Sequence, residues 1–267
     1  MKNIIFFGTK ISWICERGQL NIINDLIKRK VATYITYSNV HVVVTGKKNI
    51  ELQKAINCAY IASPDGKPLS VVGKLIGAKC MEKCSGPDMM IKIIENGLKY
   101  GYKHYFYGSE ESTLLKLKEN LLKSYPEINI VGMYSPPYRE LTPEEDRIII
   151  EDINAVKPDC IWVGLGAPKQ EVWMYNHMKS FTNGIMLGVG AAFDFHAQTL
   201  KRAPLWMQKC GLEWFYRVVK EPKRLWKRYL VTNTLFLIYL LRYGASIEVD
   251  SDLENVYECT DFCNQLP

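Results

Sequence analysis

Two glycine-containing segments carry residue types suited to binding a phosphorylated ligand. They are Val163-Gly-Leu-Gly-Ala-Pro-Lys-Gln-Glu171 and Gly188-Val-Gly-Ala-Ala-Phe-Asp-Phe-His196. Each follows a short apolar run, so each is expected where a parallel strand gives way to a loop, at the sheet edge where phosphate-bearing ligands bind. The glycines let backbone N–H groups approach a phosphate, and a helix starting near Pro168 adds its positive end. Taken alone, the glycines are equally compatible with tight turns.

The elements expected around these segments alternate between strand and helix. The pattern opens as β-α-β, with strands at 3–7 and 31–37 around a helix whose apolar residues recur at helical spacing. Further strands are expected at 58–62, 104–107, 128–131, 159–163 and 184–187, and helices at 89–100, 112–123 and 143–156. Continuous alternation with short connections predicts a Rossmann-like, mainly parallel sheet with helices on both faces.

The C-terminal quarter is expected to be helical and basic. Residues 200–229 hold nine basic and two acidic side chains, and Pro222 is expected to end one helix and open another that runs to about Tyr243. Residues 235–241 are apolar all round, but the apolar stretch is shorter than the ~20 residues that cross a bilayer. It predicts an interfacial anchor whose basic neighbours meet anionic lipid. A helix buried on the core or in a dimer is the alternative.

Three parts are therefore expected: an α/β catalytic domain at 1–204, a basic and apolar helical appendage at 205–243, and an acidic, loosely packed tail at 244–267. The first apolar run is too short for the core of a signal peptide. We therefore expect the eight cysteines to be thiols in a reducing cytoplasm. Their spacing is not that of a zinc site, and no metal or cofactor is expected.

Several short motifs, in chain order, resemble those of the WecG/TagA/CpsF glycosyltransferases, family twenty-six. The similarity covers residues 1 to about 243, and its motifs are Asp65-Gly66, Ser85-Gly-Pro-Asp88, Asn154 with Pro158-Asp159, VGLGAPKQE, GVGAAFDFHA, KRAP, GLEW, and Glu221-Pro222 with Arg224. The resemblance implies an enzyme that moves a sugar, N-acetylmannosamine-type or hexose, from a UDP donor to a polyprenyl-diphosphate-linked acceptor. It further implies inversion, no required metal, and a role in cell-surface polysaccharide, teichoic acid or capsule synthesis. Such an enzyme would work as a peripheral protein on the inner face of the cell membrane.

The resemblance assigns Asp65 the role of general base. Inverting transfer needs a base that takes the proton of the acceptor hydroxyl, and Asp65 lies on an expected strand-end loop beside a glycine that leaves access. An Asp before a Gly is also a common turn residue.

The departing diphosphate must be neutralised by side chains and backbone when no metal takes part. The resemblance assigns this task to Arg217 and Arg224, with Arg228 as a further candidate. The three are spaced 7 and 4 apart, so they share a face only if one helix continues through Pro222. A lipid-facing basic stripe is an alternative that is compatible with the same role.

The other candidates for substrate binding lie in or near the matching motifs. Gln170 suits hydrogen bonding to the donor sugar or diphosphate, Glu171 suits capping or a ribose hydroxyl, and Asp194 suits either substrate contact or holding its own loop. Three residues depart from the family pattern: Lys83 replaces an Arg, Tyr37 replaces a Thr, and Gln198 replaces a Gly. The remaining candidates are Tyr37, Asn39, Asp88, Gly164, Gly166, Lys169, Gly190 and Arg202.

Two other function classes fit the sequence less well. A nucleotide-cofactor oxidoreductase would carry Gly-x-Gly-x-x-Gly after the first strand, and Gly8-Thr-Lys does not supply it. A basic, aromatic-rich nucleic-acid-binding protein would place its charge beside a recognisable motif, whereas here the charge flanks an apolar helix. We therefore expect a UDP-sugar donor, a lipid-linked acceptor and an anionic membrane surface as partners, and no nucleic acid. Self-association is left open.

Overall fold

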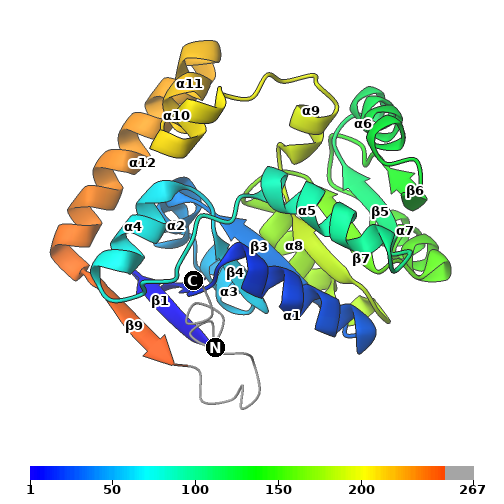
Figure 1. Ribbon diagram of the computed structural model, residues 1–267, viewed down its shortest axis with the longest axis horizontal. Coiled ribbons are helices and arrows are strands. Elements are labelled where there is room, and N and C mark those ends of the chain that lie inside the picture. Colours follow the sequence, from blue (N-terminus) through cyan, green and yellow to red (C-terminus); the bar gives the residue numbers. More distant parts are fainter. Residues whose placement is uncertain (250–267) are drawn as a thin grey trace. The chain divides into compact units, whose positions relative to one another are not determined.

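The chain forms two compact units, each assembled from segments distant in sequence (Figure 1). The computed structural model describes residues 1–249, apart from the side chain of Arg224. Within the described residues, one unit contains residues 1–18, 37–85 and 201–249, and the other contains residues 19–36 and 86–200. The predicted division of the chain at residues 204 and 243 stays a prediction.

Parallel strands form the centre of the fold, as predicted. The strands β3 (Thr33–Ser38), β8 (Ile185–Gly188), β7 (Cys160–Gly164), β5 (Lys103–Gly108) and β6 (Asn129–Tyr134) pair in this order, each parallel to the next. With β4 (Ile61–Pro64), the sheet has the order β4-β3-β8-β7-β5-β6. Because β7 and β8 are neighbours, the two glycine-containing segments leave the sheet side by side.

Helices flank this sheet (Figure 1). They are α1 (Glu16–Lys28), α5 (Gly86–Leu98), α6 (Glu111–Ser124), α7 (Pro143–Val156), α8 (Lys169–His177), the 3-10 turn Met178–Ser180 and the short α9 (Ala192–His196). The start of α7 shows how sequence fixes a boundary: the Thr142 hydroxyl accepts from the Glu145 N–H, and the Glu145 carboxylate accepts from the Thr142 N–H. This reciprocal cap satisfies two backbone donors that the helix itself cannot satisfy.

The other unit contains a second sheet, which the sequence analysis did not predict. The strands β2 (Thr9–Ser12), β1 (Lys2–Phe6) and β9 (Ala245–Val249) pair antiparallel with β1 in the middle. The expected β-α-β opening is therefore wrong, because β1 turns directly into β2 and belongs to this second sheet. The pairing also means that the first five residues after Gly244 are an ordered strand and not a loose tail. Residues 250–267 of the predicted tail lie outside the described residues.

The turn between β1 and β2 was missed because Phe7 does not look like a turn residue. Phe7 and Gly8 both have positive φ, 57° and 94°, a backbone conformation that usually selects Asn-Gly in a two-residue hairpin. Phe7 tolerates it because its ring is buried among aromatic side chains of α12 (Pro222–Tyr243). The ring centroids of Phe236 and Tyr239 lie 5.7 and 5.5 Å from that of Phe7. Tertiary packing here overrides a local preference.

Three helices of this unit were also missed: α2 (Val40–Gly46), α3 (Ile50–Asn57) and α4 (Lys67–Leu75). The valines of α2 favour a strand by composition. The deciding signals are the asparagines before α2 and α3, since Asn39 Oδ1 accepts from Val42 N–H at 3.2 Å and Asn49 Oδ1 accepts from Leu52 N–H at 3.0 Å. Both are side-chain caps of helix N-termini.

The C-terminal helices follow the predicted break. The short helices α10 (Leu205–Cys210) and α11 (Glu213–Lys220) precede α12, which starts at Pro222 and ends at Tyr243 as expected. Helix α12 packs against α2 and buries Leu225 and Phe236, while Leu237 and Leu241 are exposed. One side of α12 is thus packed within its unit, as in the alternative, while membrane contact by the exposed side stays a prediction. Across residues 1–249, no helix combines the length and apolarity needed to cross a membrane.

Replacing Phe7 tests how firmly α12 is held on the hairpin. We expect Phe7→Ala to lower the free energy of unfolding by roughly 3 kcal/mol, since it removes a buried ring. Phe7→Gly also removes the ring but relieves the positive φ, so it should be more stable than Phe7→Ala by about 1 kcal/mol, the reverse of the usual order. Denaturant titration measures both values. Tyr138→Ala, at a fully exposed ring, is the control, and an Ala variant as stable as that control would contradict the packing argument.

Candidate active site

The predicted site residues fall into two groups, one in each compact unit. The unit with residues 86–200 contributes the two glycine-containing segments and their neighbours, with Asp88 at the start of α5. The other unit contributes Asp65, Tyr37, Asn39 and the basic residues from Arg202 onward.

The side chain of Gln170 ties the two glycine-containing segments together. Its Oε1 accepts from the Gly166 N–H at 3.1 Å, and its Nε2 donates to the Gly188 carbonyl at 2.8 Å. Nε2 also donates to Glu171 Oε1 at 2.9 Å. Gln170 is buried, so its amide already serves as a cross-link between the loops after β7 and β8. Its predicted contact with the donor stays a prediction.

Glu171 is a buried carboxyl in the first turn of α8. Its Oε1 accepts from Gln170, while its Oε2 has no hydrogen-bond partner within the described part of the chain. Burial raises the pKa of Glu171 to about 7, because a charge is costly to hold away from water. A ribose contact through this side chain stays a prediction, and in this structure Glu171 supports Gln170.

The glycines at the strand ends have different reasons for being glycine. A Cβ at Gly164 would lie 2.7 Å from the Phe193 ring, so packing against α9 excludes any larger residue. Gly166 has open space around it but a φ of 77°, so its backbone conformation selects glycine. Gly190 has a φ of 54°, and a Cβ there would lie 3.5 Å from Gln170 Oε1. Packing and backbone conformation thus account for these glycines, and the approach of a phosphate to their backbone N–H groups stays a prediction.

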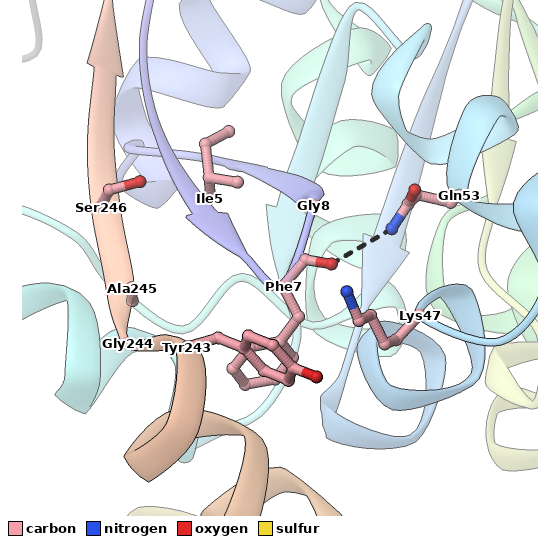
Figure 2. Close-up of a pocket in the computed structure, with 9 residues that line it drawn as sticks. All are labelled: Ile5, Phe7, Gly8, Lys47, Gln53, Tyr243, Gly244, Ala245 and Ser246. Carbon is pink, nitrogen blue, oxygen red and sulfur yellow. Dashed lines mark hydrogen bonds between the residues drawn. The ribbon is translucent and has the colours of Figure 1, made fainter.

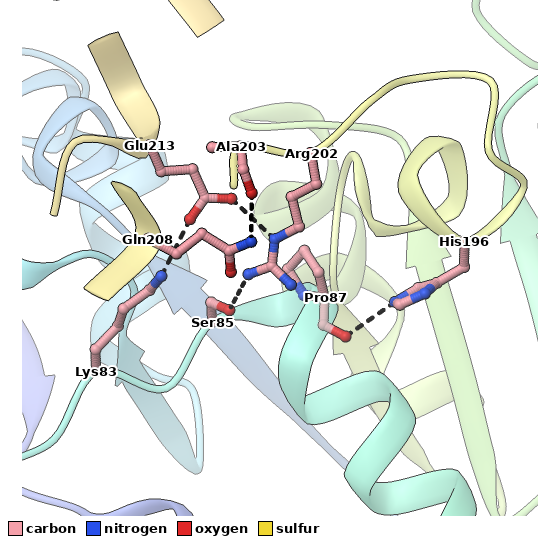
Figure 3. A network of polar contacts seen from close by, with 8 residues as sticks. All are labelled: Lys83, Ser85, Pro87, His196, Arg202, Ala203, Gln208 and Glu213. Carbon is pink, nitrogen blue, oxygen red and sulfur yellow. Dashed lines mark hydrogen bonds and ion pairs between the residues drawn. The ribbon is translucent and has the colours of Figure 1, made fainter. Parts of the chain in front are cut away.

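Two other predicted residues of this unit have defined contacts. The Asp194 carbonyl accepts from the N–H groups of Thr199 and Leu200, and the Thr199 hydroxyl donates to the same carbonyl at 3.1 Å. The Asp194 carboxylate itself accepts from the Thr199 hydroxyl at 3.5 Å, and its predicted roles in substrate contact or in holding its loop stay predictions. The Lys169 ammonium is exposed and lies 5.3 Å from the centre of the Tyr138 ring. His196, at the end of the second glycine-containing segment, is held by a contact of its Nε2 with the Pro87 carbonyl at 2.9 Å (Figure 3).

Asp65 lies directly after β4, at the loop position expected for it. Its N–H donates to the carbonyl of Ser38 at 2.8 Å, so the end of β4 is tied to the end of β3, where Tyr37 and Asn39 lie. Its side chain is half-buried, and the following Gly66 has a φ of 95°. Tyr37 is buried in β3 and Asn39 caps α2, so both also have structural roles. The backbone of Asp65 is therefore bonded to Ser38, the residue between the two binding candidates Tyr37 and Asn39.

Arg202 is engaged with the start of α11. Its Nε donates to Glu213 Oε1 at 3.0 Å, and Lys83 Nζ donates to Glu213 Oε2 at 3.1 Å (Figure 3). Arg202 Nη2 also donates to the Ser85 hydroxyl at 3.4 Å. Motifs that are more than a hundred residues apart in sequence therefore meet at one carboxylate.

The three candidate arginines are divided between two helices. Arg217 belongs to α11, while Arg224 and Arg228 belong to α12, and the side chain of Arg224 lies outside the described residues.

The structure adds His41, which the sequence analysis overlooked. Burial and the nearby charge of Arg228 lower the pKa of His41 to about 4, so its imidazole is neutral at neutral pH. In the sequence, the only feature that could have pointed to His41 is its position two residues after the binding candidate Asn39.

A hollow of about 380 Å³ lies elsewhere in this unit (Figure 2). It is formed by the hairpin turn, the start of β9 and side chains such as Lys47, whose ammonium lies 4.7 Å from the centre of the Tyr243 ring. None of its lining residues is a predicted site residue. The residues that the structure describes include no group of three or more acidic, cysteine or histidine side chains placed to hold a metal ion.

Titrating stability tests the burial of Glu171. A carboxyl whose pKa rises from 4.5 to about 7 on folding stabilises the fold fully below about pH 4.5, and this contribution is lost as the pH rises to about 7. The stability of the wild type relative to Glu171→Gln should therefore fall by roughly 2–3 kcal/mol between pH 5 and pH 8. Denaturant titration at both pH values measures it. Glu119→Gln, on the exposed face of α6, should show no such change, and a pH-independent difference for Glu171→Gln would contradict the assignment.

Comparison with known proteins identifies the family. The model of the glycosyl transferase WecG/TagA/CpsF family matches residues 4–248. Among curated relatives, the N-acetylglucosaminyldiphosphoundecaprenol N-acetyl-beta-D-mannosaminyltransferase of Bacillus subtilis (strain 168) is 28% identical over 205 residues, which are 76% of this chain and 77% of the relative. The enzyme of the same name from Bacillus spizizenii is 28% identical over 197 residues, 74% of each chain. The match includes both glycine-containing segments, Asp65 and the C-terminal helices. The chain belongs to the WecG/TagA/CpsF family of glycosyltransferases.

Proposed function

We propose that the protein is an inverting hexosyl- or N-acetylhexosaminyltransferase that moves an N-acetylmannosamine-type sugar or a hexose from a UDP donor to a polyprenyl-diphosphate-linked sugar. The family match along residues 4–248 carries the proposal, together with the names of the two Bacillus relatives, which specify an undecaprenyl-diphosphate-linked acceptor and an N-acetylmannosaminyl product. The glycine loops after β7 and β8 support it, because they present backbone groups suited to a nucleotide diphosphate.

In the proposed reaction Asp65 acts as the base. Its carboxylate takes the proton of the acceptor hydroxyl while the hydroxyl oxygen forms a bond to the anomeric carbon of the donor. The bond from that carbon to the diphosphate breaks, and UDP leaves with the electron pair. Attack opposite the leaving group inverts the configuration. The half-buried position of Asp65 after β4 suits a base that must meet both protein and substrate.

Charge on the departing diphosphate is balanced by side chains in this proposal. Arg217 and Arg228 supply guanidinium groups, which bind phosphate oxygens through two parallel hydrogen bonds. Arg224 is assigned the same role from its place in the family motif. The neutral imidazole of His41 beside Arg228 supplies a polar neighbour without adding a like charge. No metal is required by this arrangement.

The exposed face of the C-terminal helices suits contact with a lipid surface. Leu205, Trp206, Trp226, Leu230 and Leu241 are largely exposed, and basic residues lie between them in sequence. Large aromatic and aliphatic side chains next to Lys and Arg favour binding at the interface of an anionic membrane. A peripheral position on the inner face of the cell membrane would place the enzyme beside its lipid-linked acceptor.

A donor screen tests the function directly. Purified protein is incubated with individual UDP-sugars, with or without N-acetylglucosaminyl-diphosphoundecaprenol, and UDP release is measured. We expect acceptor-dependent release for one N-acetylhexosamine or hexose donor, and unchanged turnover in excess EDTA because arginines neutralise the diphosphate. Release by no donor in the presence of the acceptor would contradict the proposed function. A strict need for Mn²⁺ or Mg²⁺ would contradict the metal-independent part alone.

Replacing Asp65 by Asn tests its role as base. Asn keeps the size and most hydrogen bonding of Asp, so fold and UDP affinity should survive while kcat falls by roughly 10²–10⁴, the usual contribution of a positioned base. If Asp65 is a turn residue, Asn serves equally well and kcat stays near the wild-type value. If Asp65 binds the nucleotide, UDP affinity falls together with kcat. Steady-state kinetics and calorimetric UDP binding on the same variant distinguish the three roles.

A further inference from the structure

The carboxylate of Glu213 is shared between two cations from different parts of the chain. Its Oε2 accepts a hydrogen bond from Lys83 Nζ at 3.1 Å, and its Oε1 accepts one from Arg202 Nε at 3.0 Å (Figure 3). Each of the three side chains is about one fifth exposed, 18% for Lys83, 20% for Arg202 and 22% for Glu213. The group is therefore largely shielded from water, where ion pairs are stronger and their loss costs more than at an open surface.

Glu213 keeps its charge at neutral pH. Burial alone would raise its pKa, but the charges of Lys83 and Arg202 and their hydrogen bonds outweigh burial and hold the pKa below its usual value. Without the carboxylate, two cations would face each other in a partly buried site. The arrangement thus depends on Glu213 being an acid, and not merely on a side chain of that size.

The three residues hold together segments that lie far apart in the chain. Lys83 lies three residues before α5, and Ser85, which directly precedes α5, accepts a hydrogen bond from Arg202 at 3.4 Å. Arg202 lies just before α10. Within this segment, Gln208 Nε2 of α10 donates to the carbonyl of Ala203, which also precedes the helix, at 2.6 Å. Glu213 is the first residue of α11. One carboxylate therefore ties the start of α11 to the residues just before α10 and to the residues before α5.

Arg217 depends on the same fixed point. It lies four residues after Glu213 in α11, so the two side chains share one helix face, about 6 Å apart along the axis. Any rotation or tilt of α11 about its first residue would move the guanidinium of Arg217. The bridge at Glu213 anchors the start of α11, and its loss would release this end of the helix together with Arg217 one turn away.

We propose that Glu213 is a positioning residue of the transferase: by bridging Lys83 and Arg202 it fixes α11 and so holds Arg217 where the donor diphosphate binds. The role of Arg217 toward the donor diphosphate rests on the proposed function. The anchoring of α11 by Glu213 does not depend on it. It also gives Lys83, which stands in place of the family's Arg, the task of pairing with Glu213.

The opposite role predicts the opposite sign of effect. If Glu213 instead occupied two cations that themselves bind phosphate, its removal would expose them and tighten the binding of inorganic pyrophosphate and UDP. If Glu213 positions α11, its removal weakens the binding of both. Binding affinity in Glu213→Gln therefore distinguishes the two roles.

The variants Glu213→Gln and Lys83→Gln remove the bridge from either side. We expect both to weaken pyrophosphate and UDP binding by roughly 3–30-fold, as expected for a coupling between contacting charges, and to speed hydrogen exchange of the amides in α11. Lys83→Arg keeps the ion pair and should stay within about twofold of wild type. Glu145→Gln, which breaks the Arg139–Glu145 pair at the start of α7, is the matched control and should change neither readout. The exchanged pair Lys83→Glu with Glu213→Lys should bind better than either single change.

The inference is overturned if Glu213→Gln binds pyrophosphate as tightly as wild type or more tightly, if exchange in α11 is unchanged, or if Lys83→Arg loses as much as Lys83→Gln. Hydrogen exchange does not depend on sugar transfer. If the wild type shows no sugar transfer but the α11 amides exchange faster in Glu213→Gln than in the wild type, the proposed function is rejected. The part of the inference in which Glu213 holds α11 is then retained.

Discussion

The constraint on which the candidate phosphate site depends is that backbone groups must find partners where β7 and β8 stop. A strand that ends leaves polar groups without the neighbour that its ladder supplied, and burying them unsatisfied is costly. The amide of Gln170 solves this for both loops, since one end accepts from Gly166 and the other donates to Gly188. Its own position is fixed by Glu171 and by the first turn of α8. The shape of both loops is thereby set before any ligand binds, and a loop whose shape is fixed in advance loses less entropy on binding.

A similar dependence joins the two ends of the chain. The hairpin β1–β2 needs a strand on its other edge and a cover for the Phe7 ring, and the C-terminal segment supplies both, through β9 and the aromatic side chains of α12. The C-terminal helices are therefore part of the packing of their own unit and not simply attached to it. Their opposite face keeps large apolar side chains exposed, and this division allows one segment to serve stability and the proposed membrane contact together.

The basic C-terminal helices contain few acids, and one of these, Glu213, pairs with two cations. The C-terminal helices carry a large excess of Lys and Arg, which would repel one another if packed without acids. Glu213 balances two cations where the segment joins the rest of its unit, and His41 stays neutral beside Arg228. The carboxylate of Glu213 is thus placed where α11 begins, between cations from two distant segments.

The sequence by itself determined the alternation of strands and helices through the centre of the chain, because regular elements with periodic apolar residues and strong punctuation carry their own signals. The helix at 143–156 matched α7 residue for residue because Thr142, Pro143 and Glu145 fix its start locally. The positions of the glycine loops followed from the apolar runs before them. The sequence could also identify the family motifs, but it could not say that Gln170 faces inward or that Lys83 and Arg202 meet Glu213.

Tertiary structure decided the elements whose residues contradict their local preference. The turn at Phe7 exists because α12 covers its ring, and the strand β9 exists because β1 offers an open edge, and neither partner is near in sequence. The lowered pKa of His41 likewise comes from burial and from Arg228, which lies almost two hundred residues away. Local patterns fix an element when its energy comes from its own residues. When the stabilising contact comes from a distant segment, only the folded chain brings the two together.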